Sequence, residues 1–399
     1  MDYFSRLQRR LSAELTDNVI PFWEEHSIDR ECGGFISCLN RDGTPFDYKK
    51  QMWMQWREVY MFAALYNSEF RKNEYLEYAR SGFDFLYSNG RKPDGSYYFM
   101  LNRRGLPMEE SSGIGAEVFS ESFGAVACAE LYLASKDRKY EEEAFRCLEI
   151  YRGNTEKMEL KPDGVPGKIC WKNLAYPMIG LNVLCIMQKA FGNRIGDEEI
   201  RDCINRIRSF CEPESGLLLE RRKADGSFDL TCQDGRFVNP GHALEGLAFI
   251  LDYERTHPDA ELESWCLETA RKTVRFGWDA EQGGIRYFRD LKDLPLSKNE
   301  AMLKAWWPQC EAATAMLRAY ECSRDSEFLD WFEKIDFYSS LHLRDTEYPE
   351  WFAYAAVGGR QFHSYKGSIW KTFFHVPRYL LNAVEICRRL QINDKKESI

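Results

Sequence analysis

Apolar residues recur at helical spacing along most of this chain. Positions i, i+3, i+4 and i+7 repeat as apolar in the stretches 51–68, 74–88, 120–135, 139–151, 177–191, 198–210, 242–253, 261–276, 308–320, 326–338 and 375–390. The opening residues, MDYFSRLQRRLSAELTDNV, also have the pattern of an amphipathic helix. The hydrophobic pattern therefore predicts a helical protein with about twelve helices.

Six short strand-like segments, most of them led by glycine and closed by a turn, interrupt this pattern. They begin at Gly33 (GGFISCLNRDG), Gly95 (GSYYFMLNRRG), Gly167 (GKICWKNL), Gly216 (GLLLERRKADG), Gly283 (GGIRYFRDLKD) and Trp351 (WFAYAAVGG). Their mean spacing of about 64 residues suits one helical hairpin with its loop. Six such units predict an all-α fold, an (α/α)6 barrel of inner and outer helices with short β-ribbons in the loops at one end.

We expect residues 1–399 to form a single catalytic domain, because no Pro/Ser-rich linker divides the helical units. A two-domain helical protein remains an alternative, since the spacing between the third and fourth segments is short and residues 153–166 are polar. In a closed barrel the inner helices converge on a central funnel. The termini of the inner helices are therefore the expected place for function.

Composition narrows the function classes. The net charge is −9 and no basic block occurs, which argues against a nucleic-acid or anionic-membrane partner. The 15% aromatic content suits a sugar-binding cleft as well as a large core. The 13 cysteines include no C-x-x-C pair, and neither a membrane span nor a signal-peptide apolar region is evident. We therefore expect a cytoplasmic protein with a small neutral substrate.

Two of the six histidines stand at predicted helix starts. His242 follows a proline in NPGHALE, and His375 precedes one in FFHVPR; a proline so placed is typical of the first helical turn. Glu311 follows Pro308 in WWPQCE in the same way. The partial positive charge of a helix N-terminus favours a neutral imidazole, which can accept a proton. A histidine that merely caps its own helix would explain either one alone.

Arg57 interrupts an aromatic stripe. Helical geometry puts Trp53, Trp56, Arg57 and Tyr60 of QMWMQWREVY on one face. An arginine at the rim of such a stripe can be a surface residue, but in a barrel this face can point into the funnel. Arg57 would then offer a guanidinium fork to a substrate oxygen.

The sequence contains no complete motif for binding a metal ion or a nucleotide cofactor. His242 and Glu245 stand at i and i+3, but H-E-x-x-H is absent and no third ligand has a metal-site spacing. No P-loop or G-x-G-x-x-G in a strand-to-helix context occurs either. The sequence thus predicts neither a metal nor a cofactor.

Several motifs, in order along nearly the whole chain, resemble the N-acylglucosamine 2-epimerase family, which includes cellobiose 2-epimerases and aldose-ketose isomerases. They are VIPFWEEHSID, QMWMQWREVY, VFSESF, AYPMIGLN, DGRFVNPGHALEG, AWWPQCEA and KGSIWKTFFHVPR. The resemblance implies an (α/α)6 barrel, often dimeric, that inverts C2 of a reducing sugar without a redox cofactor. A response to ATP, which some members show, is left open, because no nucleotide motif is recognisable.

The resemblance also implies roles for individual residues. His242 and His375 match the acid/base pair, and Arg57 matches the arginine of the early helix. Glu245, Glu311 and Arg378 also match family positions and are expected to bind substrate. Beyond the resemblance, we expect Trp53, Trp306, Trp307, Asn239 and Lys366 to bind substrate as well. We expect one histidine to take the C2 proton of the open-chain sugar, and the other to return a proton to the opposite face of the enediolate.

Two features bear on the substrate. Ser368 and Thr372 replace glycines usual in the acylglucosamine branch, whereas no histidine occurs between His26 and His242, unlike in cellobiose epimerases. The balance favours interconversion of N-acetylglucosamine and N-acetylmannosamine. The alternatives are aldose-ketose isomerisation or 2-epimerisation of mannose or of a glucose- or mannose-containing disaccharide, glycoside hydrolysis by Glu245 and Glu311, and sugar binding without catalysis.

Overall fold

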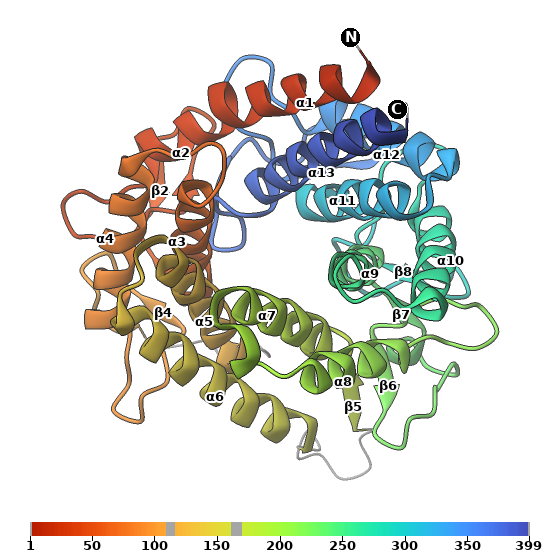
Figure 1. Cartoon of the computed structure of the whole chain (residues 1–399), viewed down its shortest axis with the longest axis horizontal. Coiled ribbons are helices and arrows are strands. Elements are labelled where there is room, and N and C mark those ends of the chain that lie inside the picture. Colours follow the sequence, from red (N-terminus) through yellow and green to blue (C-terminus); the bar gives the residue numbers. More distant parts are fainter. Residues whose placement is uncertain (1, 109–115, 161–169, 398–399) are drawn as a thin grey trace.

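The helices form a closed ring of two layers (Figure 1). This computed structural model describes residues 2–108, 116–160 and 170–397. The inner layer consists of α3 (Met52–Tyr66), α5 (Ala116–Ser135), α7 (Ala175–Phe191), α9 (Pro240–Glu254), α11 (Trp306–Ser323) and α13 (His375–Glu397). The outer layer consists of α1 (Tyr3–Ala13), α2 (Ile20–His26), α4 (Asn73–Asn89), α6 (Arg138–Leu160), α8 (Asp197–Arg208), α10 (Ala260–Gly277) and α12 (Ser326–His342).

The pairing of helices makes the ring an (α/α)6 barrel and confirms the predicted fold class. Each inner helix from α3 to α11 packs against the outer helix that follows it, and successive inner helices also pack against each other. The sixth pair joins the two ends of the chain, because α13 packs against α1.

The first predicted helix is divided. A six-residue π-helix, η1 (Glu14–Val19), separates α1 from α2, whose second residue is Pro21. Proline has no amide hydrogen to donate to the preceding turn, and a π-helical turn is one way to accommodate such a break. The described residues therefore contain thirteen α-helices instead of about twelve. Helix α6 also runs into the polar stretch, to Leu160.

Short antiparallel ribbons gather where the inner helices begin. The pairs are β1 (Cys38–Leu39) with β2 (Pro45–Asp47), β3 (Lys50–Gln51) with β4 (Met100–Leu101), β5 (Trp171–Asn173) with β6 (Arg221–Lys223), β7 (Phe237–Val238) with β8 (Arg289–Asp290), and β9 (Lys304–Ala305) with β10 (Tyr354–Ala355). Strands β3 and β9 lead directly into α3 and α11. The ribbons thus lie at one end of the barrel, as predicted, although residues 167–169 of the third repeat lie outside the described residues.

Buried ion pairs repeat between units. Asp29 with Lys50, Asp279 with Lys304, and Asp345 with Lys366 form N–O contacts of 3.0, 2.7 and 2.8 Å. All these side chains are almost completely excluded from solvent. Each aspartate also accepts backbone N–H bonds in the loop after an outer helix. The pairs fix these loops against the chain that enters the next inner helix.

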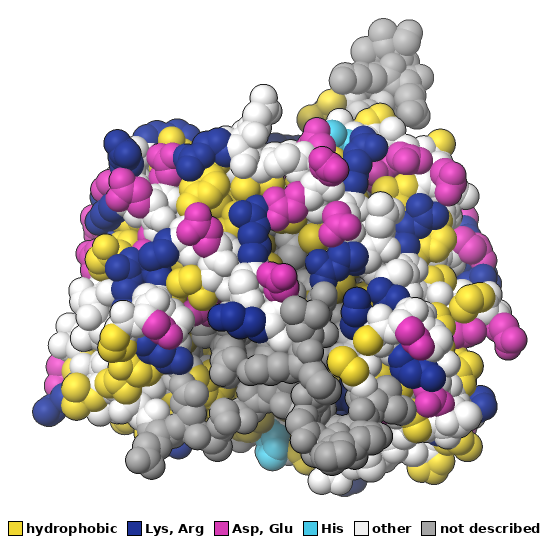
Figure 2. Space-filling view, turned by 90° about the horizontal axis from the view of Figure 1, so that it is seen from below, with side chains coloured by type: hydrophobic (Ala, Val, Ile, Leu, Met, Phe, Trp, Pro, Cys, Tyr) yellow, Lys and Arg dark blue, Asp and Glu magenta, His cyan; other side chains and the backbone are white. Residues whose placement is uncertain are grey.

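The molecular surface is mixed in charge. On the face shown in Figure 2, Lys and Arg side chains are interspersed with Asp and Glu, without a large patch of one sign. None of the described helices is both long and apolar enough to cross a membrane.

Candidate active site

The N-terminal turns of three inner helices bring the predicted ionisable residues together. Asn239 caps α9, and its Oδ1 accepts the backbone N–H of His242 at 3.2 Å. Glu311 lies in the first turns of α11, and His375 is the first residue of α13. The helix starts predicted from the prolines are confirmed.

Each imidazole is held at Nδ1 by a glutamate. His242 Nδ1 lies 2.9 and 3.1 Å from the two carboxylate oxygens of Glu220, and His375 Nδ1 lies 2.7 Å from Oε1 of Glu311. Among the described residues neither Nε2 has a hydrogen-bond partner. An Nδ1–H that donates to a carboxylate leaves the Nε2 lone pair of a neutral ring free to accept a proton.

The two rings lie against the same indole. The Trp307 ring centroid is 5.2 Å from that of His242 and 5.8 Å from that of His375. Two imidazoles in contact with one side chain are close enough to act on one small substrate. The structure thus brings the expected pair together at the N-terminal ends of α9 and α13.

The surroundings shift the two pKa values in opposite directions. Burial, together with the cations of Arg57 and Arg378, lowers the pKa of His375 well below its usual value. Burial alone would lower the pKa of His242 too, but the Glu220 carboxylate outweighs it and the pKa is raised. The pKa shift of His242 is thus opposite to the lowering expected from a helix end, because the carboxylate at 2.9 Å acts against it.

Arg57 is a partly buried cation without a carboxylate partner among the described residues. Its guanidinium carbon lies 4.2 Å from the ring centroid of Phe123 and 4.5 Å from that of Phe374, and its Nε has no hydrogen-bond acceptor there. Burial lowers the pKa of Arg57 to about 9, so the group is still a cation near pH 7. An unmet buried donor of this kind suits an oxyanion of the substrate.

Arg378 has the opposite environment. It forms ion pairs with Glu245 and, at 2.7 Å, with Oε1 of Glu311. Burial opposes its charge, but the two carboxylates outweigh burial and raise its pKa. Arg378 therefore neutralises the charges of Glu245 and Glu311.

The three expected tryptophans lie at the site in different ways. Trp307 contacts both histidines, whereas the Trp306 centroid is 6.4 Å from that of His375. Trp53 lies between Phe119 and the half-exposed Trp370, with centroid separations of 4.9 and 5.8 Å. The indole nitrogens of Trp53 and Trp306 are buried and lack an acceptor among the described residues. They are further donors that hydroxyl groups could use.

Two expected substrate-binding residues have other positions. Lys366 is fully buried, and its ammonium binds Asp345 and the backbone oxygen of Glu350 at 2.7 Å. This contact is the third copy of the repeated ion pair, so the structure gives Lys366 a structural place and not one in the funnel. Asn239 is almost completely buried and caps α9, so it acts on the position of His242.

Sequence reasoning missed Glu220. This residue directly precedes β6 and reaches His242 from a different unit of the barrel. Its only signal in the sequence is an acidic residue in the repeated segment GLLLERRKADG, just before the predicted turn. No spacing rule links it to a histidine 22 positions later.

The acidic residues also raise the questions of metal binding and hydrolysis. Oxygen and nitrogen atoms of Glu245, Glu311 and His375 lie within 4.8 Å of one another. However, Arg378 is ion-paired with both carboxylates, so it occupies the place that a metal ion would take. The same pairing argues against glycoside hydrolysis, which needs one free carboxylic acid and one free carboxylate.

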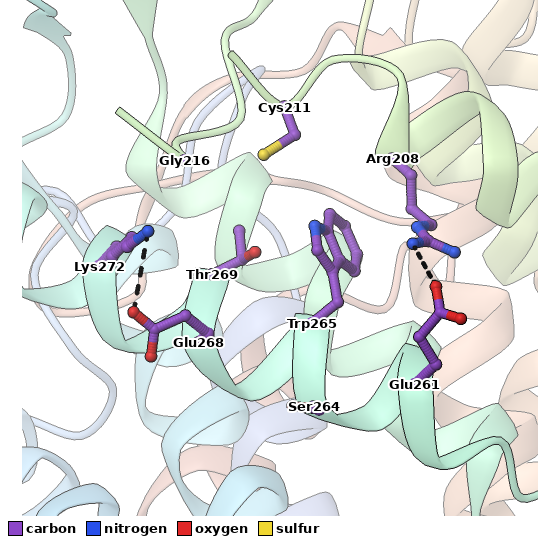
Figure 3. Close-up of a pocket in the computed structure, with 9 residues that line it drawn as sticks. All are labelled: Arg208, Cys211, Gly216, Glu261, Ser264, Trp265, Glu268, Thr269 and Lys272. Atoms are coloured by element: carbon purple, nitrogen blue, oxygen red, sulfur yellow. Dashed lines mark hydrogen bonds and ion pairs between the residues drawn. The ribbon is translucent and has the colours of Figure 1, made fainter. Parts of the chain in front are cut away.

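The molecule has two hollows of note, and one of them reaches this site. A cavity of about 560 Å³ extends from the C-terminal ends of the inner helices up to Glu311 and Arg378, and Phe249 and Arg318 also line it. A separate groove lies between α8 and α10, where Trp265 stands between the Arg208–Glu261 and Lys272–Glu268 pairs (Figure 3). None of the predicted site residues lines this groove.

Comparison with known proteins agrees with this geometry. The sequence model of the N-acylglucosamine 2-epimerase family matches residues 34–377. The chain belongs to this family. It is 34% identical to the N-acylglucosamine 2-epimerase of Rattus norvegicus, over 95% of this chain and 91% of that protein. It is 23% identical to the cellobiose 2-epimerase of Dictyoglomus turgidum, over 87% and 90% of the two chains.

A solved structure shows the same fold. The cellobiose 2-epimerase of Bacillus thermoamylovorans superposes with a TM-score of 0.80, over 96% of this chain and 99% of that one, at 18% identity. The fold of this chain therefore agrees with its family, and the protein is an enzyme of the isomerase class.

Proposed function

We propose that this protein interconverts N-acetylglucosamine and N-acetylmannosamine by moving the proton at C2. The 34% identity to an N-acylglucosamine 2-epimerase over 95% of the chain supports the substrate. The observation that carries the chemistry is the pair of imidazoles on Trp307, each held at Nδ1 by a carboxylate and each with Nε2 free.

In the proposed reaction His375 acts first as the base. Its lowered pKa keeps Nε2 unprotonated, and it takes the C2 proton from one face of the open-chain sugar. The electron pair of the broken C–H bond moves into a C1–C2 double bond and gives an enolate, and the negative charge on the former carbonyl oxygen lies beside Arg57. His242, whose raised pKa favours the imidazolium, then donates its Nε2 proton to C2 on the opposite face. The reverse reaction exchanges these roles.

Other residues would orient the sugar. Trp307 and Trp53 offer ring faces, and the free indole N–H groups offer donors to hydroxyls. Glu245 and Glu311 would act through their contacts with Arg378 and His375. All these steps use side chains alone, so we propose that the reaction needs neither a metal nor a redox cofactor.

The experiment is incubation with N-acetylglucosamine, N-acetylmannosamine, mannose and cellobiose in D₂O, followed by NMR. We expect deuterium at C2 and the appearance of the C2 epimer for the two N-acetyl sugars. A 2-ketose product would indicate aldose-ketose isomerisation, and a shorter sugar would indicate hydrolysis. Binding without deuterium incorporation across the panel would contradict an epimerase.

We also propose a cytoplasmic homodimer. All 13 cysteines are free thiols, which suits a reducing compartment. Phe337 and Leu341, one turn apart on α12, are 69% and 62% exposed and could form part of a subunit contact. Sedimentation velocity should give a dimer for the wild type and a monomer for the double variant Phe337→Ser with Leu341→Ser. A monomeric wild type would contradict this assignment.

A further inference from the structure

Buried polar contacts fix residues 366–374, the segment before α13. Lys371 Nζ lies 2.9 Å from Oε1 of Glu350 and 2.6 Å from the backbone oxygen of Lys366. Thr372, which the family resemblance places at a glycine position, is 5% exposed, and its hydroxyl donates to Oε1 of Glu58. The added side chain is thus bound to α3 and does not narrow the sugar site.

Glu58 is placed to connect this segment with the catalytic arginine. It follows Arg57 on α3 and has no exposed surface. Its second carboxylate oxygen has no hydrogen-bond partner among the described residues, and the hydroxyls of Ser27 and Ser37 are its other polar neighbours. A buried carboxyl with so few donors is more stable as the neutral acid.

The charges around Glu58 do not change this conclusion. Lys50 is the cation that acts on it, but Lys50 is already paired with Asp29 at 3.0 Å. Lys371, next to Thr372, is likewise paired with Glu350. With these cations engaged, burial raises the pKa of Glu58 to about 8.

The residues just beyond Thr372 form the centre of the site. The Phe374 ring centroid lies 4.5 Å from the guanidinium carbon of Arg57 and 4.6 Å from that of Arg378, and 4.9 Å from the ring of His375. A shift of this segment would therefore change the separation of the base from both cations at once.

We propose that the hydrogen bond between Thr372 and Glu58 is a positioning contact that holds Phe374 and His375 in register with Arg57. Neither Glu58 nor Thr372 touches the reacting atoms in this account. The effect on catalysis comes through the geometry of His375. The inference rests on the proposed epimerase activity, and its tests include one readout that does not depend on that activity.

The first test removes the hydroxyl but keeps the side-chain shape. In Thr372→Val we expect kcat for N-acetylglucosamine to fall by about tenfold to a hundredfold, because a small misplacement of a base is costly. KM should stay within about twofold, and Thr372→Ser should recover kcat to within about threefold of wild type. The matched control is Thr273→Val on α10, where a buried threonine hydroxyl lacks a partner among the described residues.

The second test uses Glu58→Gln, which keeps the shape and polarity of the neutral acid and cannot ionise. We expect the ratio of its kcat to that of wild type to stay near one below pH about 7. Above pH about 8 the ratio should rise, because only the wild type acquires a buried anion at this position. A ratio that is flat with pH, or wild-type kcat in Thr372→Val, would overturn the proposal.

The third test is NMR titration of the His375 imidazole in the full-length protein. Thr372→Val should raise the pKa of His375, because the ring moves away from Arg57 and gains solvent, whereas Thr273→Val should leave it unchanged. An unchanged pKa in Thr372→Val would refute the positioning role even if the wild type had no epimerase activity. Loss of activity from the wild type alone would refute only the proposed function.

Discussion

At the scale of single residues, the proposed acid and base are both histidines, and their different surroundings shift their pKa values in opposite directions. His375 is buried near the cations of Arg57 and Arg378, and its pKa is lowered. His242 has the carboxylate of Glu220, and its pKa is raised. Arg57 remains unpaired among the described residues, so its charge is available to the substrate.

Replacement of Glu220 tests the acid. In Glu220→Gln the pKa of His242 should fall, because the charge that raises it is gone while burial remains. The His242 imidazolium would then be lost at a lower pH. In the reaction direction in which His375 takes the C2 proton, the fall of kcat at alkaline pH should therefore begin at a lower pH than in wild type. Steady-state rates across pH measure this shift.

Glu212→Gln is the matched control, because Glu212 is buried in the preceding loop and binds backbone N–H groups instead of a histidine. The assignment of His242 as the acid would be contradicted by an alkaline limb that does not move in Glu220→Gln, or that moves equally in the control.

Sequence found the residues that lie inside recognisable motifs and missed the one that does not. His242 and His375 could be predicted because a proline marks each helix start. Glu220 could not, because its contact with His242 depends on how two units of the barrel pack. Local helix geometry predicted a lowered pKa for both histidines, and a tertiary contact with Glu220 raises the pKa of His242 instead.

At the scale of elements, repeated loops fix where each inner helix begins. The buried Asp–Lys pairs at Lys50, Lys304 and Lys366 show that one loop design recurs in three units. From the sequence alone we expect Lys366 to bind substrate. The repeat explains why it has a structural position instead, since its ion pair matches those of the other two units.

Lys366→Met tests this position. Asp345 would keep its contacts with Arg41 at 2.7 and 2.8 Å but lose one buried partner. We expect the free energy of unfolding to fall by about 2 kcal/mol, typical of a lost hydrogen bond to a charged group. KM of the folded variant should stay within about twofold of wild type. Urea denaturation and steady-state kinetics measure the two effects, and a tenfold rise in KM at unchanged stability would restore Lys366 to the binding site.

The number of helices was predictable and their ends were less so. The periodicity of 308–320 predicted α11, but the helix begins at Trp306, where β9 ends. The N-terminal helix contains a π-helical turn that periodicity does not reveal, because the apolar face continues through Leu15 and Val19.

At the scale of the whole molecule, the ring closes by pairing the two chain ends. Ser5 Oγ of α1 donates to Gln391 of α13 at 3.0 Å, and Gln391 donates to Gln8 at 2.8 Å. Helix α1 also reaches α12 through the Arg10–Asp336 ion pair at 2.6 Å. The position of His375 at the start of α13 thus depends on a helix at the other end of the sequence.

We expect the chain to unfold in one cooperative transition. Circular dichroism and tryptophan fluorescence should give coincident urea curves, because successive inner helices from α3 to α13 pack on one another. Deletion of residues 2–13 should lower the midpoint and reduce kcat although it removes no site residue. Two separate transitions, one of them unaffected by the deletion, would favour the two-domain alternative.

Hydrogen exchange at C2 in single-histidine variants tests the central claim most directly. The C2 hydrogens of the two epimers face opposite sides of the sugar, so each should meet a different imidazole. In D₂O, His242→Asn should incorporate deuterium only into the epimer whose C2 hydrogen faces His375, His375→Asn only into the other, and neither should epimerise. Exchange of the same epimer by both variants, or epimerisation above about a tenth of the wild-type rate in either, would contradict the two-histidine account.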